Sequence, residues 1–438
     1  MNNNNSYLQS LTSSIEEVTS PYRDYLTDLH EKYHPITEGF ISDYIPELGL
    51  ANPAWFGICI ATVDGQVFEV GNCQKMFTIQ SISRAFIYGL ALEDWGRDRV
   101  NRYVSVEPTA EGLNSIILDK KSNRPNNPMV DAGAIVTTDL IKGNGATERL
   151  RRILDMFRRY TGRELNISMP VCLSQKAAGH RERAIAHLML KFGTIQNKIE
   201  ETLDLYFQHC SIMLNSRDLA IMAATLANGG INPITGEKAI DSQYLQDVIS
   251  VILTCGMYDY SGEWTYKVGI PTKSSVSGGL TAIVPQKLGI GVFSPLVDER
   301  GNSVRGMKVC EDISQKFSLH LFNIYEKNQE MLKYIEEVDK ITAAAAALEN
   351  DTFQQQSLDE VITRTDELGQ LARVFLQMVQ QVKVREQKLK QQVQELQIEI
   401  DKTKQAQKVA EIVESDSFQN LKQKLQRMKK VRAEKEKK

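Results

Sequence analysis

The chain has 438 residues and a formal net charge of −3 at pH 7. Its length allows two or three domains with a large core, and its charge gives no reason to expect a nucleic-acid partner. The six cysteines are scattered without a Cys-x-x-Cys pair, which indicates reduced thiols in a cytoplasm rather than disulfides or zinc ligands. The histidines show no metal-ligand spacing and no Walker or dinucleotide glycine loop is present, so neither a metal nor a cofactor is expected.

The first 20 residues are rich in Asn and Ser and contain no basic-plus-apolar signal region, so we expect a flexible N-terminus. No apolar run approaches the ~18 residues needed to span a bilayer. We therefore expect a cytoplasmic protein without a transmembrane segment.

The first clear strand is expected over Gly57–Val63. Further along, Ser216–Leu226 indicates a buried helix with a serine cap, which Asn228-Gly229-Gly230 ends. Ala282–Pro285 and Gly289–Phe293 are typical of the two strands of a hairpin. This mixture of elements predicts an α+β domain.

A motif of chemical interest follows the first strand, where Ser81 and Arg84 are three residues apart. On a helix these positions share one face, so the later residue can reach the serine hydroxyl. A lysine at that position could lose its proton when desolvated and then deprotonate the serine. An arginine cannot, because its guanidinium stays charged at any biological pH.

The composition changes near Asn328, after which Ala, Gln, Glu and Lys dominate. Apolar residues then recur at alternating spacings of three and four, which is typical of heptads on two helices. They are Tyr334, Val338, Ile341, Ala345 and Leu348, and, after a non-helical break at about 350–357, Leu368, Leu371, Phe375, Met378 and Val382. Heptads continue less regularly from Leu389 to Ile400, which predicts a parallel coiled coil over 385–412. Residues 413–438 form a basic tail.

Several ordered blocks of the chain resemble the serine-dependent glutaminases, whose fold is similar to that of the β-lactamases and penicillin-binding proteins. The resemblance runs from about Pro21 to about Asn323 and implies a glutaminase-like domain over 21–327. The matching blocks are Asp43-Tyr44-Ile45-Pro46-Glu47-Leu48, Phe77-Thr78-Ile79-Gln80-Ser81-Ile82-Ser83, Asn127-Pro128-Met129-Val130-Asp131-Ala132-Gly133-Ala134-Ile135, Ala223-Ala224-Thr225-Leu226-Ala227-Asn228-Gly229-Gly230, Cys255-Gly256-Met257-Tyr258-Asp259 and Lys273-Ser274-Ser275-Val276-Ser277-Gly278-Gly279.

The resemblance implies that Ser81 is the nucleophile and that Tyr258 is its partner in proton transfer. Other pocket positions that match the family are Tyr44, Tyr206 and Val276. Lys273 stands where related folds keep a Lys-Ser/Thr-Gly strand, although Ser275 replaces the glycine. The family reaction converts L-glutamine to L-glutamate and ammonia.

Four polar positions depart from the family pattern. Arg84 replaces a lysine, Asp131 an asparagine, Gln175 a glutamate and Glu182 an asparagine. In the family these positions hold the α-amino and α-carboxylate groups of glutamine and activate the serine.

Three of these departures have the same effect, because each disfavours the binding of an α-amino acid. An ionised Asp131 or Glu182 can only accept hydrogen bonds and would repel an α-carboxylate, while Gln175 removes the negative charge that meets an α-ammonium. We expect Arg84 to pair with Asp131 or Glu182, because buried charges need partners. Loss of the activating base costs on the order of 10³-fold or more in acyl-transfer rate. An alternative is a substrate that carries a cation where glutamine carries its carboxylate.

The helices after the break resemble a HAMP signalling module over 333–384. Ala345-Ala346-Ala347-Leu348-Glu349-Asn350-Asp351-Thr352-Phe353 is similar to the end of its first helix, and Asp366-Glu367-Leu368-Gly369-Gln370-Leu371-Ala372 to the start of its second. HAMP modules work as parallel homodimers, so the resemblance implies at least a dimer. A generic dimerising helical hairpin is the alternative.

Three hypotheses follow. In the first, a degenerate glutaminase-like domain senses a small amino-acid-like ligand, and the helices relay its state to a signalling partner. In the second, the chain is an active amide hydrolase with Ser81 as nucleophile and with Tyr258 or Lys273 taking the proton. In the third, it is a structural coiled-coil assembly protein.

Overall fold

The computed structural model describes residues 21–109, 116, 118–119, 121–350 and 352–435, so the predicted flexible N-terminus lies outside the described residues. The chain divides into two compact units between Asn323 and Ile324. Among the described residues, every helix is too short or too polar to cross a bilayer.

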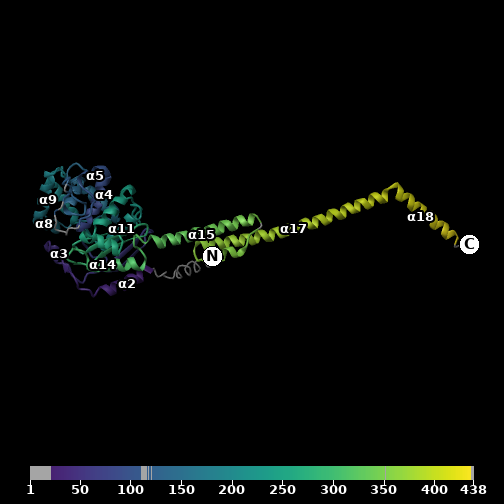
Figure 1. The fold of residues 1–438 in the computed structure, drawn as a ribbon, viewed down its shortest axis with the longest axis horizontal. Coiled ribbons are helices and arrows are strands. Elements are labelled where there is room, and N and C mark those ends of the chain that lie inside the picture. The colour runs from purple at the N-terminus through teal and green to yellow at the C-terminus, as the bar shows by residue number, and fades with distance from the viewer. Residues whose placement is uncertain (1–20, 110–115, 117, 120, 351, 436–438) are drawn as a thin grey trace, which may run out of the picture. The chain divides into compact units, whose positions relative to one another are not determined.

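The centre of the first unit is a five-stranded antiparallel sheet (Figure 1). In spatial order its strands are β3 (Val67–Gly71), β2 (Gly57–Thr62), β8 (Leu288–Phe293), β7 (Gly279–Val284) and β6 (Thr272–Ser274). The predicted first strand and the predicted hairpin are confirmed, since β7 and β8 pair through Val284 and Leu288 across a short turn.

Side chains of β2 alternate between the two faces of this sheet, as expected for a strand buried on both sides. Ile58 and Ile60 join the apolar cluster beneath α2 (Pro21–Tyr33) and α14 (Val304–Lys316). Cys59 and Ala61 join a second cluster on the opposite face, against α11 (Ser216–Ala227). Helices therefore cover both faces of the sheet.

The close packing of α11 on the sheet depends on glycines in β8. A Cβ atom on Gly291 would lie 2.0 Å from the carbonyl oxygen of Ser216, and one on Gly289 would lie 2.2 Å from the backbone nitrogen of Ala224. The expected serine cap of this helix is wrong: Asn215 is the N-cap and forms a capping box with Asp218. Each of these two side chains accepts a hydrogen bond from the backbone N–H of the other residue, an arrangement that requires a spacing of three residues, whereas Ser216 is only two residues before Asp218.

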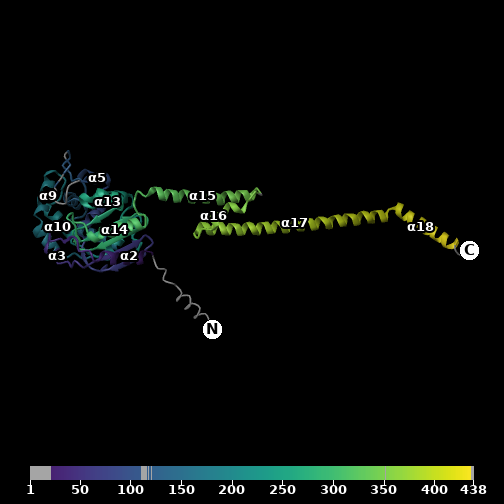
Figure 2. The same cartoon turned by 60° about the horizontal axis from the view of Figure 1, so that its bottom comes forward.

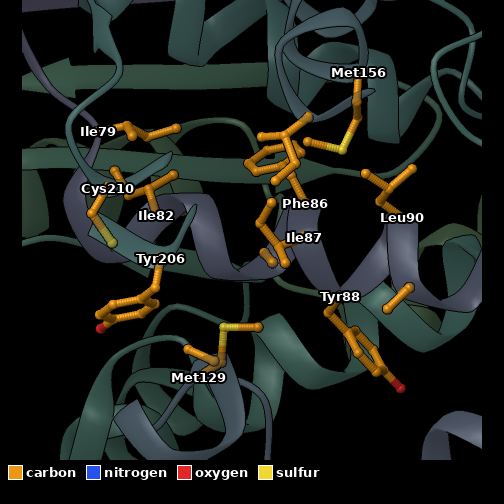
Figure 3. Close-up of a cluster of buried hydrophobic side chains, with 14 of the residues drawn as sticks. Ile79, Ile82, Phe86, Ile87, Tyr88, Leu90, Met129, Met156, Tyr206 and Cys210 are labelled. Carbon is orange, nitrogen blue, oxygen red and sulfur yellow. The ribbon is translucent and has the colours of Figure 1, made fainter. Parts of the chain in front are cut away.

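Further helices complete this unit, and most of them pack together in a second half beside the sheet. They are α3 (Pro46–Gly49), α4 (Ser83–Trp95), α5 (Arg97–Tyr103), α6 (Asp131–Asp139), α7 (Ala146–Thr161), α8 (Met169–Ala178), α9 (His180–Lys191), α10 (Ile199–Cys210), α12 (Leu245–Cys255) and α13 (Ser261–Lys267), with 3₁₀ turns η1 (Gln80–Ile82), η2 (Ser242–Tyr244) and η3 (Tyr258–Tyr260). Helix α4 is buried almost throughout and packs on α6 and α12. In Figure 3 its Phe86 lies beside Met156, while the Tyr206 hydroxyl points away from the aliphatic side chains.

Two short sheets lie where the halves meet. They pair β1 (Phe40–Ile41) with β9 (Leu296–Val297) and β4 (Phe77–Thr78) with β5 (Met213–Leu214). Strand β4 leads directly into η1 and so fixes the position of Ser81.

The second unit is helical, with α15 (Ile324–Glu349), η4 (Gln355–Leu358), α16 (Asp359–Ile362), α17 (Glu367–Glu414) and α18 (Asp416–Lys435). Two contacts show the relative direction of α15 and α17. Arg364, just before α17, pairs with Glu337 of α15. Later in both segments, Phe375 of α17 packs against Phe353, just after α15. The two helices therefore run parallel and side by side (Figure 2). The two helices therefore do not form the antiparallel hairpin that the sequence left open as an alternative, because the connecting segment returns before α17 begins.

The predicted heptad positions of α17 do not all face the same partner. Leu368 is buried against α15, whereas Leu371, Met378 and Val382 are exposed. Of the predicted positions, Leu368 and Phe375 pack within the unit, and Ala372, which was not predicted, packs beside them. An exposed apolar face is therefore left along α17.

Candidate functional site

A cavity of about 310 Å³ lies between the two halves of the first unit. All nine site residues singled out from the sequence line it: Tyr44, Ser81, Arg84, Asp131, Gln175, Glu182, Tyr206, Tyr258 and Val276. The sequence reasoning missed further lining residues, namely Phe40, Ser42, Gln80, Arg181, Phe207, Cys210, Val297, Glu299 and Gly301. Gln80 and Arg181 adjoin predicted residues in the sequence, which is the only signal that could have found them.

Ser81 lies at the centre of η1, a 3₁₀ turn that leads directly into α4. The preceding Gln80 has φ +48°, in the left-handed region that non-glycine residues rarely adopt. Its side chain holds this turn, because its amide donates to the Thr78 hydroxyl at 3.0 Å and its carbonyl accepts from Gln175 at 2.7 Å. The serine is therefore held by a locally strained and internally bonded turn.

Two groups from the opposite side of the cavity reach the Ser81 hydroxyl. The Tyr258 hydroxyl, from η3, lies 2.9 Å from Ser81 Oγ, and Lys273 Nζ, from β6, lies 3.4 Å from it. Lys273 Nζ also donates to the carbonyl oxygen of Ser274 and lies 4.2 Å from the centre of the Tyr258 ring. Tyr258, like Gln80, has a left-handed backbone, with φ +58°.

The environment of Lys273 favours its neutral form. The side chain is fully buried, and burial together with the positive charge of Arg84 holds its pKa well below the ordinary value. Burial also raises the pKa of Tyr258, so this phenol stays protonated at neutral pH. A neutral amine and a phenol can pass a proton to and from the serine.

Arg84 lies on the same side of the cavity as Ser81 but is engaged elsewhere. Its guanidinium donates to the carbonyl oxygen of Met129 at 2.6 Å, to Asp131 Oδ1 at 2.5 Å and to the Tyr206 hydroxyl at 2.8 Å. Of the two partners expected from the sequence, Asp131 and Glu182, Arg84 therefore pairs with Asp131. No hydrogen bond joins Arg84 to Ser81 among the described residues.

Asp131 begins α6 and is neutralised from both sides, because its second carboxylate oxygen accepts from Arg181. Glu182, in the first turn of α9, is only 6 % exposed and has no ion-pair partner among the described side chains. Burial, and to a lesser degree the charge of Asp131, raises the pKa of Glu182. The two acidic replacements therefore differ, because Asp131 is paired with two arginines whereas Glu182 has no ion-pair partner among the described side chains.

Gln175 is satisfied by its neighbours. Its amide nitrogen donates to Gln80, and its carbonyl accepts from the Ser211 hydroxyl at 2.9 Å. The side chain therefore braces the serine turn. Within the described residues, no group of three His, Cys, Asp or Glu side chains is placed to hold a metal ion.

Residues 39–322 match the family model described as glutaminase. A protein named glutaminase from Microcystis aeruginosa is 62% identical over 327 residues, which cover 75% of this chain and 97% of that protein. Another from Nostoc sp. is 60% identical, covering 72% of this chain and 94% of that protein.

Solved structures give the same result for the fold. The structure titled "Crystal Structure Analysis of Mglu in its native form" superposes with a TM-score of 0.67 and 39% identity, over 69% of this chain and 74% of that one. A probable glutaminase titled ybaS gives 0.67 at 35% identity, over 69% and 98%. A probable glutaminase from Bacillus subtilis gives 0.64 at 32% identity, over 68% and 97%. The second unit begins after the family match ends.

Proposed function

The chain belongs to the glutaminase family, and on this basis we propose that it is a serine amide hydrolase that releases ammonia from a carboxamide. The observation that carries the proposal is the approach of Tyr258 and Lys273 to the Ser81 hydroxyl, at 2.9 and 3.4 Å. In this proposal Lys273 acts as the general base, because Arg84 stays protonated and cannot accept the serine proton.

The proposed reaction has two stages. Ser81 Oγ attacks the amide carbonyl carbon while its proton passes to Lys273, either directly or through the Tyr258 hydroxyl. The same proton then passes to the leaving nitrogen as the C–N bond breaks, which releases ammonia and leaves an acyl ester on Ser81. A water molecule attacks this ester by the same route and releases the carboxylic acid. Atoms and protons balance in both stages.

The test is ammonia release from a panel of carboxamides, glutamine included, by the full chain and by Ser81→Ala. We expect turnover of at least one amide by the wild type and its loss, by about 10³-fold or more, in the variant. Turnover that survives in Ser81→Ala, or none from any amide, would contradict the proposal. Ser277→Ala, at a buried hydroxyl outside the cavity lining, is the matched control and should retain activity.

A second candidate is a ligand-binding regulatory protein that does not hydrolyse amides. The specific observation in its favour is the Arg84–Asp131 ion pair, which occupies the place where the family resemblance implies a lysine and an asparagine. A panel in which amides bind without any ammonia release would favour this candidate. A structural assembly role would be favoured if no amide bound at all.

For the second unit we propose a HAMP-like module and coiled coil that pair two copies of the chain in parallel. Exposed apolar residues recur along α17 with heptad-like spacing: Leu371, Met378, Val382, Leu389, Val393, Leu396 and Ile400. The helix is 48 residues and therefore about 72 Å long, and a lone helix with such a stripe exposes apolar surface that a second copy would bury. Parallel running of α15 and α17 supports the HAMP-like arrangement over a hairpin.

The dimer is expected to depend on this stripe. Leu389→Glu combined with Leu396→Glu places like charges at facing positions, so the full chain should become monomeric in light scattering coupled to gel filtration. Gln387→Glu with Gln394→Glu, at the same seven-residue spacing off the stripe, is the matched control and should stay dimeric. A monomeric wild-type chain would contradict the proposed dimer.

A further inference from the structure

The cavity holds one buried carboxylate that no other side chain engages among the described residues. Glu182 is 6 % exposed, yet its carboxylate forms no ion pair and no hydrogen bond with another side chain among the described residues. A buried carboxylate has about four lone-pair sites and no donor of its own when ionised. The backbone N–H of Glu182 donates to it, but this leaves most of those sites open, so a ligand that supplies N–H groups at this point would be favoured.

The two arginines that line the cavity, Arg84 and Arg181, form ion pairs with Asp131 and not with Glu182. Arg84 donates to Met129, Asp131 and Tyr206, and Arg181 donates to Asp131. These contacts hold the guanidinium groups against the cavity wall. A carboxylate on a ligand would have to compete with Asp131 for them.

The remaining charged residues of the lining are acidic. With Arg84 and Arg181 set against Asp131, Glu182 and Glu299, two cations face three anions, so the lining carries a formal charge of −1. Tyr44 lies close enough to Glu182 for the acid to raise the pKa of its phenol, after the larger effect of burial. A cation held by Glu182 would therefore also meet the face or hydroxyl of an aromatic ring.

From this arrangement we infer that the site selects a carboxamide that carries an ammonium group, bound by Glu182 beside Tyr44, and that has no carboxylate. The inference rests on the proposed function for the identity of the reacting group, because the amide end is placed at Ser81. It names the substrate class as amino-carboxamides rather than α-amino acids. Glu182 is then the residue that determines specificity.

Three related molecules separate the contributions of the two charged groups. Glutamine carries both an ammonium and a carboxylate, 4-aminobutanamide is glutamine without its carboxylate, and 4-carbamoylbutanoate is glutamine without its ammonium. Their binding to the full-length Ser81→Ala variant can be measured by calorimetry, because that variant cannot consume them. We expect 4-aminobutanamide to bind about tenfold to a hundredfold more tightly than 4-carbamoylbutanoate, with glutamine between them.

Glu182→Gln, made in the same Ser81→Ala background, should remove this preference, since it keeps the shape of the side chain and loses its charge. Glu200→Gln is the matched control, because Glu200 also lies in the first turn of a helix, α10, but is exposed and does not line the cavity. Equal or tighter binding of 4-carbamoylbutanoate, or a preference that survives Glu182→Gln, would overturn the inference. If 4-aminobutanamide binds as expected but the wild type releases no ammonia from it or from any other amide of the panel, the hydrolase proposal fails and the inferred ligand class stands.

Discussion

Replacing Lys273 with methionine is expected to lower kcat for amide hydrolysis by about 10³-fold or more and, at neutral pH, to make the protein more stable. The loss of activity follows because Lys273 is the amine nearest to the Ser81 hydroxyl, at 3.4 Å, and its environment favours the neutral form. The gain in stability follows because methionine fills a similar volume without a buried amine.

The pH dependence of both effects can be worked out from the pKa of Lys273. Burial and then Arg84 lower this pKa in the folded protein, whereas the unfolded chain has the ordinary value of about 10.4. Between the two values the unfolded chain binds a proton that the folded chain lacks, so stability rises with pH. The stability gain of Lys273→Met is therefore largest at and below the folded pKa and disappears as the pH approaches about 10.4. The wild-type kcat should rise with pH through the folded pKa.

Steady-state kinetics and urea unfolding across this pH range test the prediction together. Lys287→Met, in the exposed turn between β7 and β8, is the matched control and should change neither property. An unchanged kcat in Lys273→Met would reject Lys273 as the base. If Arg84→Lys greatly raised the activity and Lys273→Met remained active, the general base would be the residue at position 84.

Replacing Asp131 with alanine is expected to destabilise the first unit by about 3–5 kcal/mol. Asp131 accepts from Arg84 and Arg181, and the Arg84 side chain is only 7 % exposed. Without the carboxylate, Arg84 would be left as a buried charge whose remaining acceptors are neutral oxygens. Few single substitutions in this unit should have a larger effect on stability.

Urea unfolding followed by tryptophan fluorescence reports on this unit alone, because Trp55, Trp95 and Trp264, the three tryptophans of the chain, all lie within it. Glu263→Ala, which breaks an exposed ion pair with Lys267, is the control and should cost about 0–1 kcal/mol. A loss of the same small size in Asp131→Ala would contradict the prediction. Adding Arg84→Met to Asp131→Ala should restore part of the lost stability, since it removes the stranded charge.

Much of the fold and the composition of the cavity could be predicted from the sequence. The predicted strand and hairpin depend on local patterns, and the pocket residues depend on motif matches that already encode distant contacts, such as Ser81 with Tyr258. That Arg84 would pair with Asp131 or Glu182 followed from charge alone, because a buried guanidinium needs an acid, but only the structure selects Asp131.

Other features depend on tertiary distances that no local pattern contains. The burial of Lys273 and its reach to Ser81 depend on how β6 lies against η1. The bond from Gln175 to Gln80 shows that the former braces a turn, whereas its sequence position indicated only a lost charge. Heptad spacing identifies the apolar positions of α17 but not the direction of its partner, so the parallel packing on α15 could not be read from it.

The ion pair between Arg84 and Asp131 also restricts how the sequence of this protein can evolve. A change of Asp131 alone strands a buried guanidinium, and a change of Arg84 to lysine alone gives up the several directed contacts that a guanidinium makes at once. Either first step lowers fitness through stability before the second can repair it. The two positions therefore behave as one heritable unit, and a lineage that has acquired both is kept by epistasis from returning through single substitutions.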